Sequence, residues 1–418
     1  MKKCRISGEK LTPIVDFGEI YLNDFLKYPN KSAPTGKLKL GFGKQSKLLQ
    51  LLNTADHDKL YRNYWYRSGT NRTMNDQLKD IVNSIPKWIT LNKGDVVLDI
   101  GCNDGTLLKH YNSLGNYFKV GIDPAKNIGS EGKKNANAHA VDFFNKQTFK
   151  RLSKKKAKVI TTIAMFYDLE KPNKFMSDLC AALDKDGIWI LQVQYTPLMI
   201  SLNAFDNIVH EHIEYYTLES LIPLFSKFKL EIVDAEINDV NAGSIRLTVK
   251  KKKNIMQTVA GFTKEIGKLR LQSLIAYEKK FKYSNKNIYL SFKKRVNTQK
   301  VKLIKLLLKL KKQNKKVYGY GASTKGNTLL QYYKIDKSLV KAIADRQPTK
   351  DGLLTVGSWI PIISEKKMRK IKPDYLLVLP WHFIHEFIER EKNFLKNGGK
   401  FIVPLPEVKI IGLNDLKK

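Results

Sequence analysis

The sequence predicts an α/β protein built around a wound parallel sheet, with a small β-rich module before it and a smaller α/β domain after it. Three observations predict this class. Between residues 91 and 250, apolar strand-like runs alternate with helix-like segments, the pattern of a parallel sheet covered by helices. Two strand–glycine–helix units begin at Val96 and Val317. Before residue 72, short strand-like pieces lie between proline- and asparagine-containing turns.

The composition is that of a globular chain with several domains. Its 418 residues are 42% hydrophobic, enough for two or three cores. No apolar run approaches the ~20 residues of a membrane span. The N-terminus shows no apolar signal core, and three cysteines argue for a reducing compartment. We expect a cytoplasmic protein without a membrane partner, as a monomer or homodimer.

The net charge of +36 raises the question of a nucleic-acid partner. The lysines are spread along the chain and no nucleic-acid motif accompanies them, so nucleic acid is not an expected partner. Solvated lysine on the surface explains the charge more simply. The charge would still attract an anionic substrate such as a nucleotide sugar.

Residues 1–72 form the N-terminal module, with strands expected at Leu11–Phe17, Lys37–Phe42 and Leu48–Leu51. Cys4 lies where a zinc knuckle could begin, but Ser7 stands at the second position of that pair and no second pair of cysteines follows. Because structural zinc needs four thiolate or imidazole ligands, no metal is expected.

The module closes with an aromatic stretch that contains Tyr64, Trp65 and Tyr66. These rings either pack between domains or supply a phenol to an active site, and the sequence leaves both readings open.

Residues 73–250 form the central domain. Its expected strands are Val96–Ile100, Phe118–Ile122, Lys158–Thr162, Ile188–Val193, Leu230–Ala235 and Ser244–Lys250. Its expected helices are Met74–Ile85, Lys109–Leu114, Lys146–Lys154, Asn173–Leu183 and Leu218–Lys227. Ligands of such sheets bind at the carboxyl ends of the strands.

The first strand ends in a loop with Gly101, Asn103, Asp104 and Gly105, which lets a flat ligand lie against bare backbone. Asp123 ends the next strand, ~20 residues on, where an acid can accept both ribose hydroxyls. Asp104 is a poor neighbour for phosphate but tolerates a cation. The pattern favours S-adenosylmethionine over a dinucleotide, with an ordinary βαβ turn as the alternative.

Three further segments fall where strands are expected to end, namely Asp142–Phe144, Ala164–Asp168 and Gln192–Tyr195. In the first, Asp142 and Phe143 could edge an adenine, with an acid for its amine and a ring for stacking. Apolar core is the alternative for Met165 and Phe166 in the second.

The segment Asn241–Arg246 is a polar, glycine-containing turn into a strand and could line the same cleft.

The most informative polar cluster is His210, Glu211, His212 and Glu214. A histidine beside a carboxylate is the arrangement of a general base whose tautomer is held by its neighbour. Two alternatives remain, a loop-packing cluster and a metal site, although no third ligand is apparent.

Residues 251–418 begin with two expected amphipathic helices, separated by a break near Tyr283–Asn287. Their basic face is most simply solvated, with a membrane-surface helix as the alternative. A second glycine loop follows at Gly319–Lys325, with Ser323, Thr324 and Lys325 at an expected helix N-terminus that favours anions. Strands are expected at Val340–Ala344, Tyr375–Leu379 and Lys400–Val403. This unit either binds a phosphate-bearing substrate or is purely structural.

The chain resembles the nucleotide-sugar C-methyltransferases, S-adenosylmethionine enzymes that add a methyl branch to a keto-deoxysugar. The segments that carry the resemblance are Cys4-Arg5, Leu22–Leu26, Tyr64–Gly69, Ile100–Leu108, Gly121–Pro124, Met165–Leu169, His210–His212, Asn241–Arg246, Gly319–Thr328 and Trp381. The resemblance implies three domains, namely an N-terminal zinc module, a central class I methyltransferase domain of Rossmann-like fold, and a C-terminal α/β domain that helps to hold the nucleotide sugar.

The resemblance also implies roles for single residues. Its cofactor-binding positions fall on Gly101, Asn103, Asp104, Gly105, Asp123, Asp142 and Phe143. Its catalytic positions fall on His212 as base, Glu211 as its partner, His210 beside them, and a tyrosine at Tyr66, with Tyr64 as the alternative. Its substrate-binding positions fall on Tyr64, Asn241, Ser244, Arg246, Lys325, Arg346 and Trp381, of which Lys325 and Arg346 would face the pyrophosphate.

Three departures from the family pattern involve five positions. The zinc cysteines beyond Cys4 fall on Ser7, Gly43 and Ser46. Val209 stands where many members have a tyrosine before His-Glu-His, and Asp168 stands where many have a histidine after the Lys158–Thr162 strand.

The chemistry expected from this pattern begins with a carbon next to a ketone. His212 would remove its proton, with Glu211 orienting the imidazole, and a phenol would stabilise the enolate oxygen. The enolate carbon would then take the methyl group. A sugar O-methyltransferase and a non-catalytic relative that binds S-adenosylmethionine or nucleic acid are the alternatives.

Overall fold

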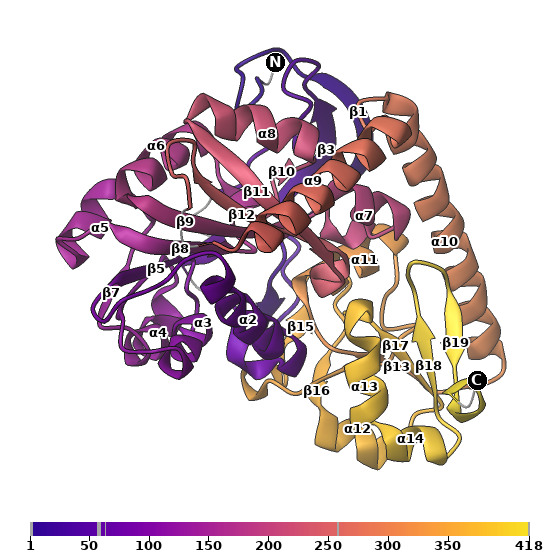
Figure 1. Cartoon of the computed structure of the whole chain (residues 1–418). Helices are drawn as coiled ribbons and strands as arrows, with labels where there is room; N and C mark the ends of the chain where they lie inside the picture. The colour runs from indigo at the N-terminus through magenta and orange to yellow at the C-terminus, as the bar shows by residue number, and fades with distance from the viewer. Residues whose placement is uncertain (1–2, 57–59, 63, 257–258, 417–418) are drawn as a thin grey trace.

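The computed structural model describes residues 3–56, 60–62, 64–256 and 259–416, and it confirms the α/β class. The central element is a seven-stranded sheet in the order β11-β12-β9-β8-β5-β6-β7 (Figure 1). Its strands are β5 (Val96–Ile100), β6 (Phe118–Asp123), β7 (Ala138–Val141), β8 (Ala157–Ile163), β9 (Leu183–Gln194), β11 (Leu230–Asn238) and β12 (Ser244–Lys251). Strands β5 to β9 pair in parallel, and β12 is antiparallel to both of its neighbours.

The strand order reverses between β6 and β8, which both pair with β5. In open α/β sheets a crevice forms outside the carboxyl ends of the strands at such a point. All five residues of β5 are buried, so this strand lies in the middle of the core. The glycine loop after β5 therefore opens into the place where a ligand is expected.

Helices cover both faces of this sheet. They are α2 (Arg72–Ser84), α3 (Thr106–His110), α4 (Gly129–Lys134), α5 (Lys146–Leu152), α6 (Pro172–Ala182), α7 (Thr196–Ser201) and α8 (Leu218–Lys227). Helix α8 begins with Thr217 as its cap. The buried carboxylate of Glu278 accepts hydrogen bonds from the N–H groups of Leu218 at 2.7 Å and Glu219 at 2.9 Å. A carboxylate there matches the positive end of the helix dipole.

The N-terminal module is a small antiparallel sheet, β1-β3-β4-β10. Its strands are β1 (Thr12–Tyr21), β3 (Thr35–Phe42), β4 (Leu49–Leu51) and β10 (Glu214–Tyr215). The last strand comes from the central part of the chain and pairs with β4 directly after His212. The Leu51 N–H also donates to the Ile213 carbonyl at 2.9 Å. The N-terminal module thereby fixes the backbone of the histidine cluster.

The positions that correspond to zinc ligands come together around a carboxylate. The Cys4 thiol donates to the Ser46 hydroxyl at 3.3 Å. Glu9 accepts hydrogen bonds from the Ser7 hydroxyl at 2.9 Å and the Ser46 N–H at 2.8 Å, and these bonds lower its pKa. A Cβ on Gly43 would lie 2.7 Å from the Glu9 carboxylate. With one thiol and a central carboxylate, this donor set does not fit zinc.

Two long helices connect the central sheet to the C-terminal part, and their break lies where the sequence predicts it. Helix α9 (Gly261–Phe281) packs on β11, and α10 (Lys286–Lys312) runs along the side of the molecule from the N-terminal sheet to the C-terminal one (Figure 1). The buried face of α10, which includes Val296, Leu303 and Leu307, belongs to the same hydrophobic cluster as the C-terminal strands.

The C-terminal sheet has six strands in the order β16-β14-β13-β17-β18-β19. They are β13 (Val317–Tyr320), β14 (Ile343–Asp345), β16 (Ile362–Ser364), β17 (Tyr375–Val378), β18 (Lys400–Val403) and β19 (Lys409–Ile411). Its helices are α11 (Thr324–Tyr333), α12 (Glu365–Ile371), α13 (Ile384–Arg390) and α14 (Lys392–Lys396). A short pair, β2 (Phe25–Leu26) with β15 (Leu354–Thr355), joins this part to the N-terminal module.

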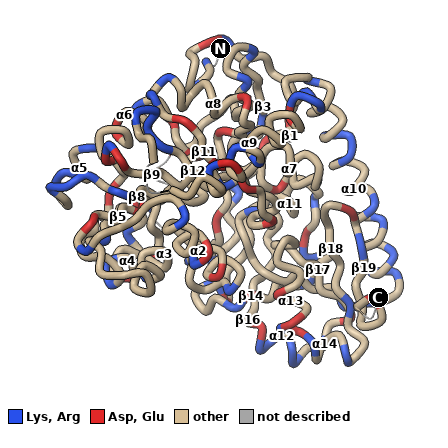
Figure 2. The backbone as a smooth tube through the Cα atoms, in the orientation of Figure 1, with Lys and Arg blue, Asp and Glu red and all other residues tan. Residues whose placement is uncertain are grey.

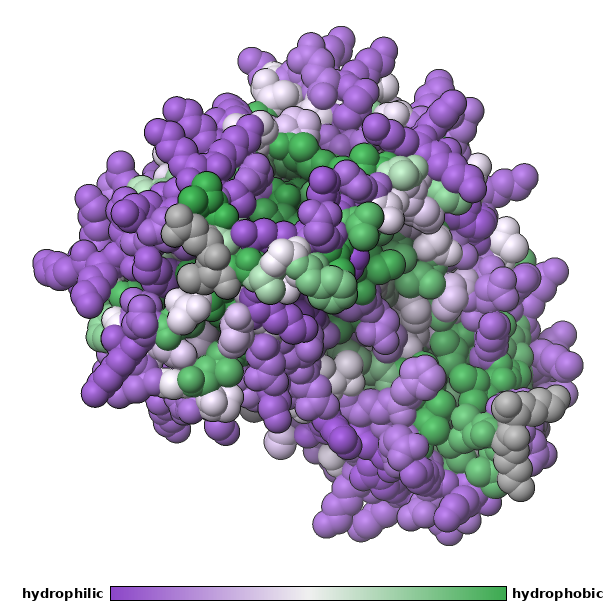
Figure 3. All heavy atoms as spheres, viewed as in Figure 1, coloured by the Kyte–Doolittle hydropathy of each residue, from purple (hydrophilic) through white to green (hydrophobic). Residues whose placement is uncertain are grey.

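Lysine and arginine lie on most elements, most densely along α10, and acidic residues are interspersed with them (Figure 2). The face in Figure 3 is mostly hydrophilic at its rim, with apolar residues toward the middle and near the C-terminus, where Ile410 and Leu416 are exposed. Within the described ranges, none of the helices combines the length and hydropathy needed to cross a bilayer.

Candidate active site

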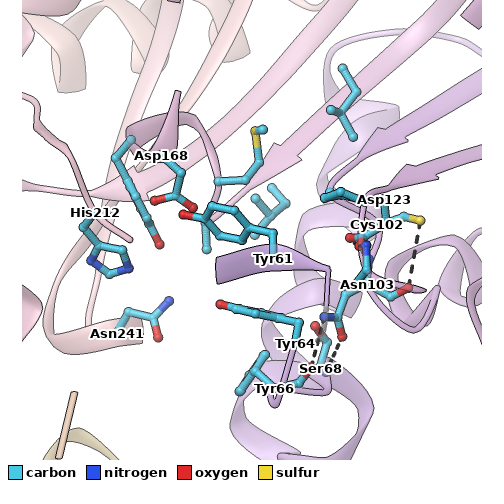
Figure 4. A pocket seen from close by; sticks show the side chains of 18 of the residues that line it. Tyr61, Tyr64, Tyr66, Ser68, Cys102, Asn103, Asp123, Asp168, His212 and Asn241 are labelled. Carbon is cyan, nitrogen blue, oxygen red and sulfur yellow. Dashed lines mark hydrogen bonds between the residues drawn. The ribbon is translucent and has the colours of Figure 1, made fainter. Parts of the chain in front are cut away.

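A cavity of about 320 Å³ lies between the carboxyl ends of the central strands and the start of α11. Its two ends carry different groups. Gly101, Asn103 and Asp123 line one end, and His212, Asp168 and Asn241 line the other, with Tyr61 and Tyr64 between them (Figure 4). The first group comes from the turns after β5 and β6, so the nucleoside site that the sequence predicts faces the same space as the histidine.

Gly101 turns the chain directly after β5 with a φ of +75°, and a Cβ there would lie 3.1 Å from Met165. Only glycine adopts this conformation without strain. Bare backbone therefore forms the cavity wall at this position. Gly105 has a φ of +76° at the start of α3 and packs against the backbone of Gly132 in α4, so its role is to start the helix rather than to line the cavity.

Asn103 and Asp104 fasten the tyrosine segment over the glycine loop. The Asn103 amide accepts from the Ser68 N–H at 3.0 Å and donates to the Tyr66 carbonyl at 3.1 Å. The Asp104 carboxylate accepts from the Gly69 N–H at 2.7 Å and from the Thr106 hydroxyl at 2.6 Å. Asp104 is not among the described residues that line the cavity, and its role as a cofactor ligand stays a prediction.

Asp123 is 7% exposed and lines the cavity. Its oxygens accept from the backbone N–H groups of Asn103 at 2.8 Å and Ala125 at 2.9 Å, which holds the carboxylate rigidly. Each oxygen keeps a second lone pair for a hydroxyl group. Behind Asp123 lies Asp99, whose pKa is raised to about 7 by burial. The Thr161 hydroxyl donates to the Asp99 carboxylate at 2.6 Å.

The two residues expected to edge an adenine differ in their placement. Phe143 lines the cavity, and the Arg62 guanidinium lies 4.9 Å from its ring centroid. Asp142 accepts from the Thr148 hydroxyl at 3.1 Å and from the Phe143 N–H at 2.8 Å, and Arg151 lies 3.5 Å from it. Asp142 is not among the described residues that line the cavity, and its assignment to the adenine stays a prediction.

The tyrosines divide between the two ends. Tyr64 is held by Asn127, which both accepts from its N–H and donates to its carbonyl at 2.9 Å. Burial raises the pKa of the Tyr64 phenol, with Asp168 and Glu211 adding to the effect. Tyr66 is 37% exposed, and the charges that act on it are Asp104, Arg346 and Glu386. Both tyrosines line the cavity, with Tyr64 toward the histidine end, so the choice of Tyr66 as the reactive phenol, with Tyr64 as the alternative, stays a prediction.

His212 lies at the reactive end with a defined tautomer. Its Nδ1 lies 3.0 Å from the carbonyl oxygen of Asn207. A carbonyl oxygen only accepts, so Nδ1 carries the hydrogen and the lone pair is on Nε2. Burial and the nearby Lys325 charge lower the pKa of His212 to about 3, which keeps it neutral at pH 7. The Tyr167 ring supports it, with ring centroids 4.4 Å apart.

The expected Glu211–His212 partnership is wrong, because the backbone carbonyl of Asn207 orients the imidazole instead. Glu211 is buried, and burial raises its pKa to about 7. His210 is also placed differently: its Nε2 lies 3.0 Å from the Gly36 carbonyl, and a Cβ on Gly36 would clash with it. His210 thus joins the cluster to β3 and is not part of the cavity wall.

The Asn241–Arg246 turn divides in the same way. Asn241, with a φ of +56°, lines the cavity. Ser244 donates to the Val240 carbonyl at 2.9 Å, and Arg246 pairs with Asp80 of α2 at 2.6 Å and with Glu236 at 3.6 Å. These contacts correct the assignment of Ser244 and Arg246 to the substrate, because both stabilise the sheet and its covering helix.

The C-terminal part contributes Lys325 and His382 to the cavity wall. Lys325 is the second residue of α11. The two other substrate candidates are engaged elsewhere. The Trp381 indole donates to Asp206 at 3.0 Å, and Arg346 pairs with Glu386 at 3.4 Å, so both assignments are corrected.

Tyr61 and His382 are among the cavity residues that had no role assigned from the sequence, and Asp168 ends the strand-end segment Ala164–Asp168 that the sequence singled out. Tyr61 donates to the Glu211 carbonyl at 3.0 Å. Asp168 has its pKa raised by burial and by Glu211. Its place after β8 was the available signal, since strand ends of this sheet carry ligands. His382 follows a strand of the second sheet, and no local pattern relates it to the first.

Comparison with known proteins agrees with this arrangement. Residues 70–235 match the family described as "Methyltransferase domain". Residues 239–406 match "C-methyltransferase C-terminal domain". The chain is 28% identical over 366 residues to C-methyltransferase NovU of Streptomyces niveus. The aligned region covers 87% of this chain and 85% of that protein.

Solved methyltransferase structures are similar to part of the chain. Magnesium protoporphyrin IX methyltransferase from Synechocystis PCC 6803, with bound S-adenosylhomocysteine, is 14% identical, with a TM-score of 0.34, 43% of this chain covered and 87% of that one. The cyclopropane synthase MmaA2 from Mycobacterium tuberculosis is 12% identical, with a TM-score of 0.35, 46% of this chain covered and 90% of that one.

The central domain is thus a class I S-adenosylmethionine-dependent methyltransferase domain of Rossmann-like fold. The methyltransferase segment is followed by the segment that matches the C-methyltransferase C-terminal domain. Together with the similarity to a C-methyltransferase over most of the chain, these two segments identify an S-adenosylmethionine-dependent C-methyltransferase.

The residues present fit that cofactor. A glycine wall at Gly101 admits a flat group, and Asp123 offers rigid acceptors for hydroxyl groups. Asp99, Asp104 and Asp123 act on one another electrostatically, so this end of the cavity favours positive charge. A sulfonium is a cation without hydrogen-bond donors, and such a field suits it.

Proposed function

We propose that the protein methylates a carbon next to the ketone of a nucleotide-linked keto-deoxyhexose through an enolate formed by His212. The observation that carries the proposal is the neutral imidazole whose Nδ1 is held by the Asn207 carbonyl while the ring lines the same cavity as Gly101 and Asp123. A base is needed for transfer to carbon, because a carbon becomes nucleophilic only after it loses a proton.

The residues that hold the cofactor in this proposal are Gly101, Asn103, Asp123 and Phe143, which line one end of the cavity. When bound there, S-adenosylmethionine supplies an electrophilic methyl group. Asp123 would accept the ribose hydroxyls and the backbone at Gly101 would lie against the nucleoside.

The sugar would occupy the other end, against His212, Asn241 and Tyr64 (Figure 4). Its diphosphate would lie toward the N-terminus of α11, where Ser323 and Thr324 line the cavity and helix N–H groups favour an anion. This placement accounts for the contribution of the C-terminal part to the wall.

In the reaction, His212 Nε2 takes the proton from the carbon, and the electron pair of the C–H bond becomes the enolate. That carbon forms a bond to the methyl carbon as the sulfur–methyl bond breaks, and the imidazolium then returns its proton to solvent. The rigid wall residues contribute by holding the two carbons close together.

The test uses methyl-¹³C-labelled S-adenosylmethionine with a panel of keto-deoxyhexoses linked to dTDP, GDP or CDP. Carbon NMR of the product should show a methyl group bonded to carbon. A methoxy signal would instead identify an O-methyltransferase, and labelled cofactor that binds without turnover on any sugar would identify a non-catalytic relative.

A further inference from the structure

Lys325 reaches the reactive end of the cavity from the C-terminal part of the chain. Lys325 lies two residues after Ser323, which caps α11 by accepting a hydrogen bond from the Gly326 N–H at 3.0 Å. Its ammonium group donates one long hydrogen bond, to the Asn241 carbonyl at 3.5 Å. An ammonium has three N–H donors. Among the contacts of Lys325 in the described residues, this hydrogen bond leaves N–H donors of the ammonium that can bind a ligand beside Asn241.

The charged and titratable groups that face Lys325 come from three elements. Asp206 lies in a short helix (Phe205–Asn207), His212 follows it in the chain, and His382 lies beyond β17. Asp206 also accepts from the Trp381 indole at 3.0 Å, which holds it in place. Burial lowers the pKa of both histidines, and the charge of Lys325 lowers it further, so the ammonium acts electrostatically on the base.

The opposite wall offers a developing negative charge weaker partners than an ammonium. There the Tyr61 hydroxyl donates to the Glu211 carbonyl at 3.0 Å, and burial raises the pKa of Asp168. A carboxyl group that burial keeps protonated offers at most a neutral hydrogen bond, whereas an ammonium offers a charge-assisted one. The phenol of Tyr64 faces the same acids. An enolate oxygen therefore gains most on the side of Lys325.

We propose that Lys325 is a catalytic residue, whose ammonium donates a hydrogen bond to the ketone oxygen of the substrate and stabilises the enolate formed by His212. The inference rests on the proposed function and deepens it. The sequence assigned Lys325 to the diphosphate of the substrate, whereas this proposal gives it a role in the chemical step. The electron pair released from the C–H bond ends on the oxygen that Lys325 holds, while the proton goes to Nε2 of His212. No other reactant is needed.

The experiment isolates proton removal from methyl transfer. The enzyme is incubated in D₂O with S-adenosylhomocysteine in place of the methyl donor and with the nucleotide sugar that gave turnover in the panel. Exchange of the hydrogen next to the ketone for deuterium is then followed by NMR. Lys325→Met is compared with Lys325→Arg, which keeps the charge, and with Lys334→Met, which removes an exposed lysine from the end of the same helix.

Lys325→Met should slow exchange about 100-fold or more, the size seen when one oxyanion donor is removed, with the KM of the nucleotide sugar nearly unchanged. Lys325→Arg should retain most of the exchange, and Lys334→Met all of it. In the wild type, exchange should fall as the pH rises through about 8, because burial lowers the pKa of Lys325 to that value. Arginine at this position should remove that fall, because it stays charged.

The inference is overturned if Lys325→Met exchanges at the wild-type rate but has a KM for the nucleotide sugar that is raised tenfold or more. Lys325 would then bind the diphosphate instead. An Arg variant that keeps the fall above pH 8 would also overturn it. Absence of exchange and of methylation in the wild type with every sugar of the panel would instead defeat the proposed function itself.

Discussion

The two glycine loops of the chain are built alike and differ in what fills them. Each follows a buried parallel strand and leads into a helix, and each faces an acid at the end of the neighbouring strand, Asp123 in the central sheet and Asp345 in the C-terminal one. Asp123 accepts from the N–H groups of Asn103 and Ala125, and Asp345 accepts in the same way from Ala322 and Gln347.

On the side that faces Asp345, side chains fill the second loop. Lys350 donates to the Ala322 carbonyl at 2.7 Å and lies 3.8 Å from Asp345, and its ammonium lies 4.8 Å from the Phe25 ring centroid. A Cβ on Gly321 would lie 2.6 Å from Pro380. The comparison teaches that a strand–glycine–helix pattern predicts a local shape, while the residues that pack on it decide whether a ligand can enter.

The largest expected effect tests whether the chemistry belongs to the first loop's cavity. His212→Asn removes the base and should lower methyl transfer about 10³-fold, within the usual range for a general base. Binding of S-adenosylhomocysteine, measured by calorimetry, should stay near the wild-type value. Turnover within tenfold of wild type would show that another group removes the proton.

The next effect compares the two acids directly. Asp123→Ala should weaken cofactor binding by about 10- to 100-fold, because hydrogen bonds to a charged group contribute about 1.5–3 kcal/mol. Asp345→Ala is the matched control and should leave cofactor affinity unchanged. Equal losses in the two variants would break the distinction between an open and a closed loop.

A third prediction concerns the closure of the second loop. Lys350→Met removes a buried ammonium and leaves the Ala322 carbonyl without its donor, so the free energy of unfolding should fall by about 1–3 kcal/mol. Urea denaturation measures this loss. Cofactor affinity should not change, and a gain of a second cofactor site would contradict the account.

The last prediction concerns a pH dependence at Asp99, in the strand that leads into the first loop. Burial raises the pKa of Asp99 from 3.8 to about 7, so the folded state holds a proton that the unfolded state has lost between these values. Its contribution to stability is complete below pH 3.8 and is lost as the pH rises toward about 7, by at most about 1.4 kcal/mol per pH unit. Asp99→Asn should therefore lose less stability than wild type across this window, as thermal unfolding would show.

Much of the fold could be predicted because its signals are local. Val96–Ile100, Lys400–Val403 and Leu218–Lys227 have the predicted bounds, since each is an apolar or amphipathic run with clear ends. The strand Ala138–Val141 was missed because it is short and half exposed, with little apolar pattern to reveal it.

The site was less predictable because its contacts join distant segments. His212 was found from its neighbours, but its true partner is a backbone carbonyl, which leaves no sequence signature. Arg246 is in the right motif, yet its strand position directs it to Asp80. His382 enters the cavity only because the C-terminal part packs against the central sheet.

The measurement that tests the central claim most directly is a crystal structure with S-adenosylhomocysteine and the nucleotide sugar bound. The account predicts the ribose of S-adenosylhomocysteine on Asp123, its adenosine against Gly101, and Nε2 of His212 facing the carbon next to the ketone. An adenosine seated away from Gly101 and Asp123, or a His212 ring turned away from the sugar, would contradict it.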